Sequence, residues 1–187
     1  GLSFLREIRS GVKRKVPGLA AVIGGGNTAI DVARSVIRQG GQAVIIYRRR
    51  RDDMPAFAEE VQSALEEGVE LRELLAPVEI TAVGPDCLLT LQPMQIAGRD
   101  RDGRGKIAPA AAPPIQITVQ RVFTATGAEA AASWYNPTAG GAPETGVIFS
   151  HCRLHADGRG APVVYGGDLT TADKNVTQAI ASAASAA

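Results

Sequence analysis

Short apolar runs alternate with amphipathic stretches through the first third of the chain. Residues 19–23 and 43–47 are two such runs, and each has the all-apolar character of a strand buried on both faces of a parallel sheet. Between them, Ile30, Ala33 and Ile37 recur with helical period. The order strand, helix, strand within about 30 residues predicts a βαβ unit.

Capping and breaking residues predict where the helices begin and end. Asn27 is the predicted N-cap of the helix inside the βαβ unit. Residues 2–9 predict a short amphipathic helix that is closed by Gly11. Pro55 is expected to open a further helix in the first-turn position that proline favours, with Phe57 on its apolar face.

The periodicity changes to alternating apolar and polar positions from about residue 78 to residue 119. This pattern predicts an antiparallel β-meander. Its tip, residues 98–105, is charged with nearly balanced signs, so we expect a solvated hairpin there. Residues 69–71 and 121–127 predict further strands of the parallel sheet, so the meander is an insertion into an α/β body.

Composition and charge exclude several classes of function. The 187 residues carry 20 Lys and Arg against 19 Asp and Glu, and only 4% are aromatic, which argues against nucleic-acid or membrane partners. Cys87 and Cys152 are too far apart for a C-x-x-C pair, which suits a reducing cytoplasm and excludes disulfide-reductase chemistry within this chain. His151 and His155 beside Cys152 lack a fourth ligand, so no metal site is predicted.

A glycine-rich motif lies between the first predicted strand and its helix. Gly24, Gly26 and Ala29 match G-x-G-x-x-A, in which the first glycine permits a tight turn, the second lets a pyrophosphate approach the backbone, and the alanine allows close helix packing. The helix N-terminus adds free N–H groups and a positive dipole end. The motif therefore predicts a dinucleotide site and a Rossmann-like parallel sheet with helices on both faces. The predicted pyrophosphate-binding residues are Gly24, Gly25, Gly26, Asn27 and Thr28.

The end of the second strand indicates which dinucleotide is bound. An NAD-binding domain would place an acidic residue there for the ribose 2′-hydroxyl, but residues 48–51 are four consecutive arginines. An arginine suits the 2′-phosphate of NADP because its planar fork binds phosphate through paired charged hydrogen bonds. We therefore predict that Arg48 and Arg49 read the 2′-phosphate and leave Arg50 and Arg51 unassigned. Asp52 and Asp53 are expected to pair with neighbouring arginines, and a merely solvated basic turn is the alternative.

Seven short motifs follow one another along the chain. They are residues 22–31, Tyr47-Arg-Arg, Met54-Pro-Ala, 66–69, 124–127, 165–168 and 175–180. In this order they resemble the NADPH-binding region of the glutamate synthase small subunit and the FAD- and NADPH-binding part of dihydropyrimidine dehydrogenase.

The resemblance implies a division of the chain and a larger parent. In this family the FAD domain is discontinuous, and the NADPH domain is inserted into it. The expected division is a linker helix over 1–15, an NADPH-binding domain over 16–130 and a return segment of an incomplete FAD domain over 131–187. Because only one dinucleotide fingerprint is present, we expect a fragment of a longer polypeptide that is inactive by itself.

The resemblance also implies cofactor contacts and partners. Ala125, Thr126 and Gly127 would border the nicotinamide half of NADPH, whereas Gly167, Asp168 and Thr177 would lie against FAD. The parent would pass hydride from NADPH to FAD, and electrons onward to iron–sulfur centres and a partner or large catalytic subunit.

Two other functions stay open. A stand-alone NADP-dependent dehydrogenase would need an acid or base near Gly127, and no Tyr/Lys or His candidate is well placed there. A non-catalytic nucleotide-binding or interaction module would keep the fold for binding only. No catalytic residue is nominated.

Overall fold

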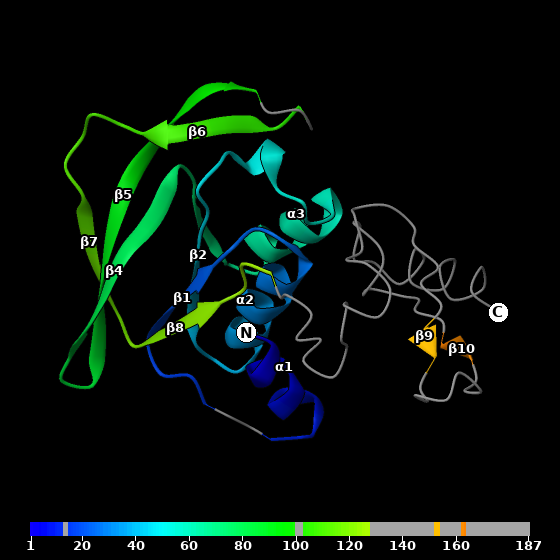
Figure 1. Ribbon diagram of the computed structural model, residues 1–187. Coiled ribbons are helices and arrows are strands. Elements are labelled where there is room, and N and C mark those ends of the chain that lie inside the picture. Colours follow the sequence, from blue (N-terminus) through cyan, green and yellow to red (C-terminus); the bar gives the residue numbers. More distant parts are fainter. Residues whose placement is uncertain (13–14, 100–102, 128–151, 154–161, 164–187) are drawn as a thin grey trace. The chain divides into compact units, whose positions relative to one another are not determined.

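The computed structural model describes residues 1–12, 15–99, 103–127, 152–153 and 162–163 (Figure 1). The chain divides into two compact units, residues 1–127 and 128–187. In the second unit the described residues form one antiparallel pair, β9 (Cys152–Arg153) with β10 (Pro162–Val163). In the described part of the chain, no helix has both the length and the apolar character needed to cross a membrane.

A four-stranded parallel sheet forms the centre of the first unit. Its strands are β1 (Leu19–Ile23), β2 (Gln42–Ile46), β3 (Glu70–Arg72) and β8 (Arg121–Thr124), in the spatial order β3-β2-β1-β8. Ile23 pairs with Ile46 on one side and with Thr124 on the other, so β1, β2 and β8 end at the same edge. That edge is where the connecting loops carry the predicted site.

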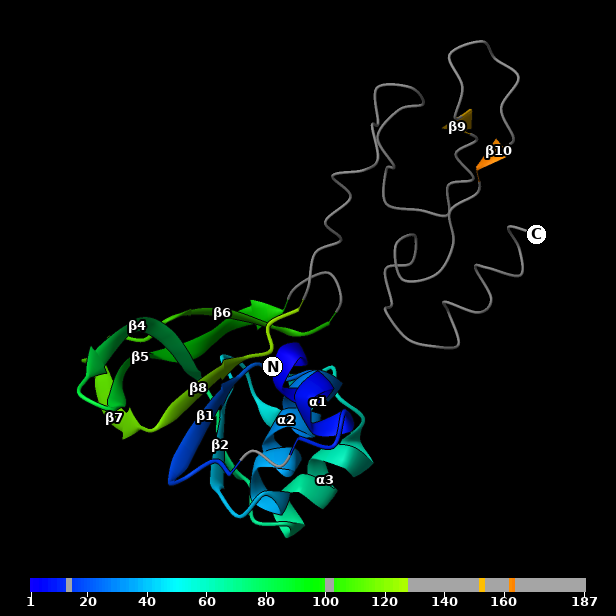
Figure 2. The ribbon, with the colours of Figure 1, turned by 90° about the horizontal axis from the view of Figure 1, so that it is seen from below.

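Helices cover one face of this sheet. They are α1 (Leu2–Arg9), α2 (Asn27–Arg38) and α3 (Ala58–Glu66), and Figure 2 shows them on the same side of the strands. Val22, Ile45 and other alternate strand residues point to this side, where they pack with Ile30 and Val36 of α2. All four of these side chains are at most 2% exposed, so this layer is a closed apolar core.

An antiparallel sheet covers the other face. It consists of β4 (Leu75–Val83), β5 (Asp86–Arg99), β6 (Gly105–Pro109) and β7 (Ile115–Val119). The long β5 is its centre, because β4, β6 and β7 all pair with it antiparallel. Leu89, Leu91 and Val119, all fully buried, pack on Val44 and Ile46 of the parallel sheet.

The predicted fold class, a Rossmann-like parallel sheet with an antiparallel insertion, is confirmed, but one detail of its layers is corrected. Helices were expected on both faces, whereas in the described residues the second face is covered by the antiparallel sheet. The physical reason lies in the chain after β3, which continues into strands instead of a second set of crossover helices. Apolar alternation along β5 and β7 supplies the face that buries the sheet.

The predicted starts of two helices were wrong. Gly26, not Asn27, is the N-cap of α2. The helix α3 begins at Ala58 with Phe57 as its N-cap, so Pro55 precedes the helix, and the Phe57 side chain is 61% exposed. Two hydrogen bonds explain both differences: the Asn27 Oδ1 accepts the Phe57 N–H at 3.0 Å, and the Ala56 N–H donates to the Gly25 carbonyl at 3.2 Å. They hold Phe57 in an extended conformation outside the helix.

Candidate functional site

Three loops meet at the carboxyl edge of the parallel sheet (Figure 1). The glycine loop, residues 24–26, follows β1. The arginine loop, residues 47–53, follows β2, and residues 125–127 follow β8. The fold thus brings the glycine motif, the arginine run and the predicted nicotinamide-side residues to one edge. Ligands of open α/β sheets bind at such an edge.

Two of the three glycines in this loop, Gly24 and Gly25, are required by the fold itself. Gly24 has a φ of +140°, and a Cβ there would lie 2.3 Å from the carbonyl oxygen of Ala125. A Cβ on Gly25 would lie 2.4 Å from Cε2 of the Tyr47 ring. Larger side chains at these positions would push the glycine loop away from its two neighbouring loops.

The third glycine is different because the protein leaves the space beside it open. Among the described residues, a Cβ on Gly26 would meet only Pro55 Cγ, at 4.0 Å, and its φ of −89° is ordinary for any residue. No side chain caps α2 there, and within the described residues the backbone N–H groups of Asn27 and Thr28 have no hydrogen-bond acceptor. Ala29, fully buried, lets the helix approach the sheet closely. Free donors and an open backbone face together form a cradle of the kind that binds anions at helix N-termini.

The arginine loop begins with a buried tyrosine in place of an acidic residue. Tyr47 is 7% exposed, and its hydroxyl donates to the backbone carbonyl of Asp53 at 2.8 Å. Burial raises the pKa of the Tyr47 phenol, and the nearby Arg49 guanidinium opposes part of that rise. The tyrosine is therefore a neutral structural residue that carries no charge into the site.

The two predicted phosphate readers differ in their surroundings. Arg48 is exposed. Arg49 is partly buried, and its Nε donates to the carbonyl of Gly105 at 2.8 Å. Arg51 points elsewhere, because its Nη2 donates to Oε1 of Gln62 on α3 at 2.9 Å.

The hairpin end of the antiparallel sheet reaches the arginine loop, and the sequence carried no signal of this contact. Asp53 was expected to pair with an arginine, but its Oδ1 accepts the N–H of Gly105 at 2.9 Å. Gly105 is buried, whereas Arg99 and Arg104 of the predicted solvated tip are exposed. A cavity of about 450 Å³ lies beside this contact, lined by Arg50, Asp52, Asp53, Ile96, Arg99, Gly103, Arg104 and Gly105.

The predicted nicotinamide-side residues adjoin the glycine loop. The Ala125 N–H donates to the carbonyl of Ile23 at 2.8 Å, and Thr126 and Gly127 are exposed beyond it. The predicted flavin-side residues Gly167, Asp168 and Thr177 lie outside the described residues, as do His151 and His155.

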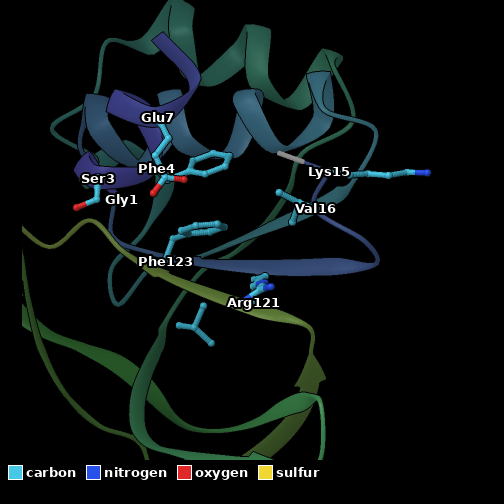
Figure 3. Close-up of a pocket in the computed structure, with 9 residues that line it drawn as sticks. Gly1, Ser3, Phe4, Glu7, Lys15, Val16, Arg121 and Phe123 are labelled. Carbon is cyan, nitrogen blue, oxygen red and sulfur yellow. The ribbon is translucent and has the colours of Figure 1, made fainter. Parts of the chain in front are cut away.

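A second cavity, of about 250 Å³, lies between α1 and β8 (Figure 3). Phe4 of α1 faces Phe123 of β8 there, with ring centroids 4.7 Å apart. Glu7, Lys15 and Arg121 also line it, but none of the predicted site residues does. This cavity is therefore separate from the cradle at the glycine loop.

No protein-family model matches the chain, but several curated proteins do. The oxidoreductase YgfK of Escherichia coli K12 is 43% identical over 105 residues, which is 55% of the chain and 10% of that protein. The beta subunit of the NADP(+)-dependent formate dehydrogenase of Moorella thermoacetica is 31% identical over 188 residues, covering 97% of the chain and 26% of the subunit. The small chain of the NADPH glutamate synthase of Azospirillum brasilense is 38% identical over 100 residues, covering 53% and 20%. The chain thus spans between a tenth and about a quarter of the length of these relatives.

Solved structures share the fold at low sequence identity. The Mycobacterium tuberculosis oxidoreductase FprA in complex with NADPH matches with a TM-score of 0.51 and 17% identity, over 63% of the chain and 41% of FprA. The E. coli flavoprotein disulfide reductase RclA matches with a TM-score of 0.55 and 17% identity, over 89% of the chain and 34% of RclA. The sequence relatives confirm the resemblance predicted from the motifs, because the chain is similar to the glutamate synthase small chain and to the formate dehydrogenase beta subunit, and the solved structures share its fold.

Proposed function

We propose that this chain is the NADPH-binding module of a flavin-dependent oxidoreductase of the glutamate synthase small-subunit type. When bound, NADPH supplies a hydride and FAD accepts it. The chain's own residues bind and orient the nucleotide, because in such enzymes the cofactors carry the chemistry.

The open backbone at Gly26 is the observation that carries the proposal. Contacts among the described residues explain why positions 24 and 25 are glycine, but none of them explains position 26, where a Cβ would fit without a clash. A ligand that lies against the backbone would explain the glycine at position 26. The uncapped N–H groups of Asn27 and Thr28 favour an anion as that ligand. A dinucleotide pyrophosphate has the charge and the shape that this cradle accepts.

The preference for NADPH over NADH rests on the arginine loop. At the end of β2, where a carboxylate would bind the ribose hydroxyls of NADH, the chain has the neutral, buried Tyr47 followed by Arg48 and Arg49. An acidic side chain at this position would repel a 2′-phosphate, whereas guanidinium groups attract it and form charged hydrogen bonds with it. We therefore assign both arginines to the 2′-phosphate.

The remaining parts of the proposal concern the parent protein. Residues 16–130 would form the NADPH domain and 131–187 the return to an FAD domain, whose other half lies outside this chain. The names of the relatives describe a beta subunit and a small chain, which supports a partner subunit. Electron transfer to this partner through iron–sulfur centres is proposed from the resemblance of the motifs. The cytoplasm is the proposed location, because the two cysteines do not form a disulfide framework.

Isothermal titration of the 187-residue chain with NADPH and with NADH tests the proposal. We expect tighter binding of NADPH. Replacing Arg48 by alanine removes a charged contact to the 2′-phosphate, so the Kd for NADPH should rise about tenfold, while the Kd for NADH changes little.

Arg51→Ala is the matched control. It removes the same charge from the same loop, but the Arg51 side chain is bound to Gln62. Its effect on NADPH binding should stay below about threefold, which is the scale of a distant, screened charge. Equal or tighter binding of NADH by the unaltered chain would overturn the cofactor assignment.

A further inference from the structure

The arginine loop forms hydrogen bonds with both the backbone N–H and the backbone carbonyl of one glycine in the antiparallel sheet. Gly105, the first residue of β6, donates its N–H to Asp53 Oδ1 at 2.9 Å, and its carbonyl accepts Arg49 Nε at 2.8 Å. Asp53 and Arg49 belong to one loop, and Gly105 lies more than fifty positions further along the chain. The three residues therefore form a clamp between the two sheets.

The clamp depends on glycine at position 105. A Cβ there would lie 2.7 Å from Cδ1 of Ile96 and 3.0 Å from Oδ2 of Asp53. A side chain would thus push the hairpin away from the aspartate that binds it. A backbone hydrogen bond also attaches the arginine loop next to the start of β4, because the Leu74 N–H donates to the Arg49 carbonyl at 3.2 Å.

Asp53 also connects the clamp to the glycine loop. Its backbone carbonyl accepts the Tyr47 hydroxyl at 2.8 Å, and the Tyr47 ring is the group that a Cβ on Gly25 would strike. Asp53 therefore links the two parts of the candidate site. The glycine loop would hold the pyrophosphate, and the arginine loop would hold the 2′-phosphate.

We propose that Asp53 is a positioning residue for cofactor selection, which acts through Gly105 on the orientation of Arg49. This inference rests on the proposed function, namely that Arg49 binds the 2′-phosphate of NADPH. The bond at Nε restricts rotation of the guanidinium, so less freedom is lost when the phosphate binds. The antiparallel insertion thereby becomes part of the specificity site, although none of its own side chains need touch the nucleotide.

Charge repulsion alone predicts the opposite effect of an Asp53 substitution on NADPH binding, which makes the inference testable. A carboxylate close to a bound phosphate repels it, so removing the charge of Asp53 should strengthen NADPH binding if charge were all that mattered. If Asp53 positions Arg49, its removal weakens NADPH binding. Asp52 is the matched control, because it carries the same charge one residue earlier and is exposed.

The experiment measures the Kd for NADPH and for NADH by titration calorimetry on the full chain. Asp53→Ala should reduce the preference for NADPH about threefold to tenfold at an unchanged Kd for NADH, since one hydrogen bond to a charged group is lost. Asp53→Asn keeps an oxygen that accepts the Gly105 N–H, so it should retain most of the preference. Asp52→Ala should leave the preference unchanged or raise it.

A double-mutant cycle shows whether Asp53 acts through Arg49. The losses from Asp53→Ala and Arg49→Ala should not add, whereas those from Asp53→Ala and Arg48→Ala should add. An unchanged or increased preference in Asp53→Ala, or equal losses for NADPH and NADH, would overturn the inference while the proposed function stands. If the unaltered chain shows no preference for NADPH, the proposed function fails first and this inference with it.

Discussion

Alanine substitutions at Gly24 and Gly26 should separate the contribution of the glycine loop to folding from its contribution to binding. At position 26 the added Cβ meets only Pro55 Cγ at 4.0 Å, and the backbone is already in a common conformation. Alanine is a poorer N-cap than glycine, by about 0.5–1 kcal/mol, but it reduces the freedom of the unfolded chain by a similar amount. The free energy of unfolding of Gly26→Ala should therefore stay within about 0.5 kcal/mol of the unaltered chain.

Binding by Gly26→Ala should fall sharply. The new methyl group occupies the face where a pyrophosphate would approach, so at least one charged hydrogen bond to the helix N–H groups is lost. Such a bond contributes about 1.5–3 kcal/mol, which corresponds to an increase in Kd of about tenfold to a hundredfold. NADPH and NADH should lose affinity equally, because both carry the pyrophosphate.

Gly24→Ala is the comparison. Its φ of +140° disfavours any side chain, and its Cβ would lie 2.3 Å from the Ala125 carbonyl oxygen. Strain and overpacking should together cost at least about 2 kcal/mol of stability. Urea unfolding measures stability, and titration calorimetry measures Kd. Unchanged nucleotide binding in Gly26→Ala, or a stability loss as large as that of Gly24→Ala, would refute the reasoning.

Two further predictions concern stability. Glu67 accepts hydrogen bonds from Arg34 and Arg38, which lower the pKa of its carboxyl from 4.5 to about 2. A lowered pKa stabilises the folded chain above pH 4.5, and this stabilisation is lost as the pH falls from 4.5 towards 2. Urea unfolding should therefore show a stability difference between the unaltered chain and Glu67→Gln that shrinks over this pH range. A constant difference would contradict this. Phe4→Ala should cost about 3 kcal/mol in the same assay, because Phe4 is 5% exposed and packs on Phe123. Phe4→Leu should lose less than half as much, and a loss below about 1 kcal/mol for alanine would mean that α1 contributes little to the core.

Local patterns predicted the elements whose formation depends on neighbours in the sequence. The strand at residues 19–23 and the helix in the βαβ unit were found where the periodicity indicated. Buried parallel strands and amphipathic helices are encoded in every few residues, so a single sequence contains the signal. The start of α3 was misplaced because hydrogen bonds to Gly25 and Asn27 hold Ala56 and Phe57 outside the helix.

The sequence predicted which residues form the candidate site, but it did not predict the contacts that they make with one another. The motif indicated which residues would gather at the carboxyl edge, because parallel strands end there together. It did not indicate that Tyr47 packs against Gly25, or that Gly105 joins Asp53 and Arg49. These contacts join segments from different strands, and no local period records them.

The amino-acid sequence by itself therefore determined the βαβ unit, the cradle of glycines and the basic loop, since each follows from the chemistry of adjacent residues. Only the tertiary structure decided which face of the parallel sheet received the helices and which received the antiparallel sheet. It also decided that the hairpin end fastens the arginine loop. The physical reason is that burial of Leu89, Leu91 and Val119 against β1 and β2 depends on how distant segments pack, and packing is a property of the whole fold.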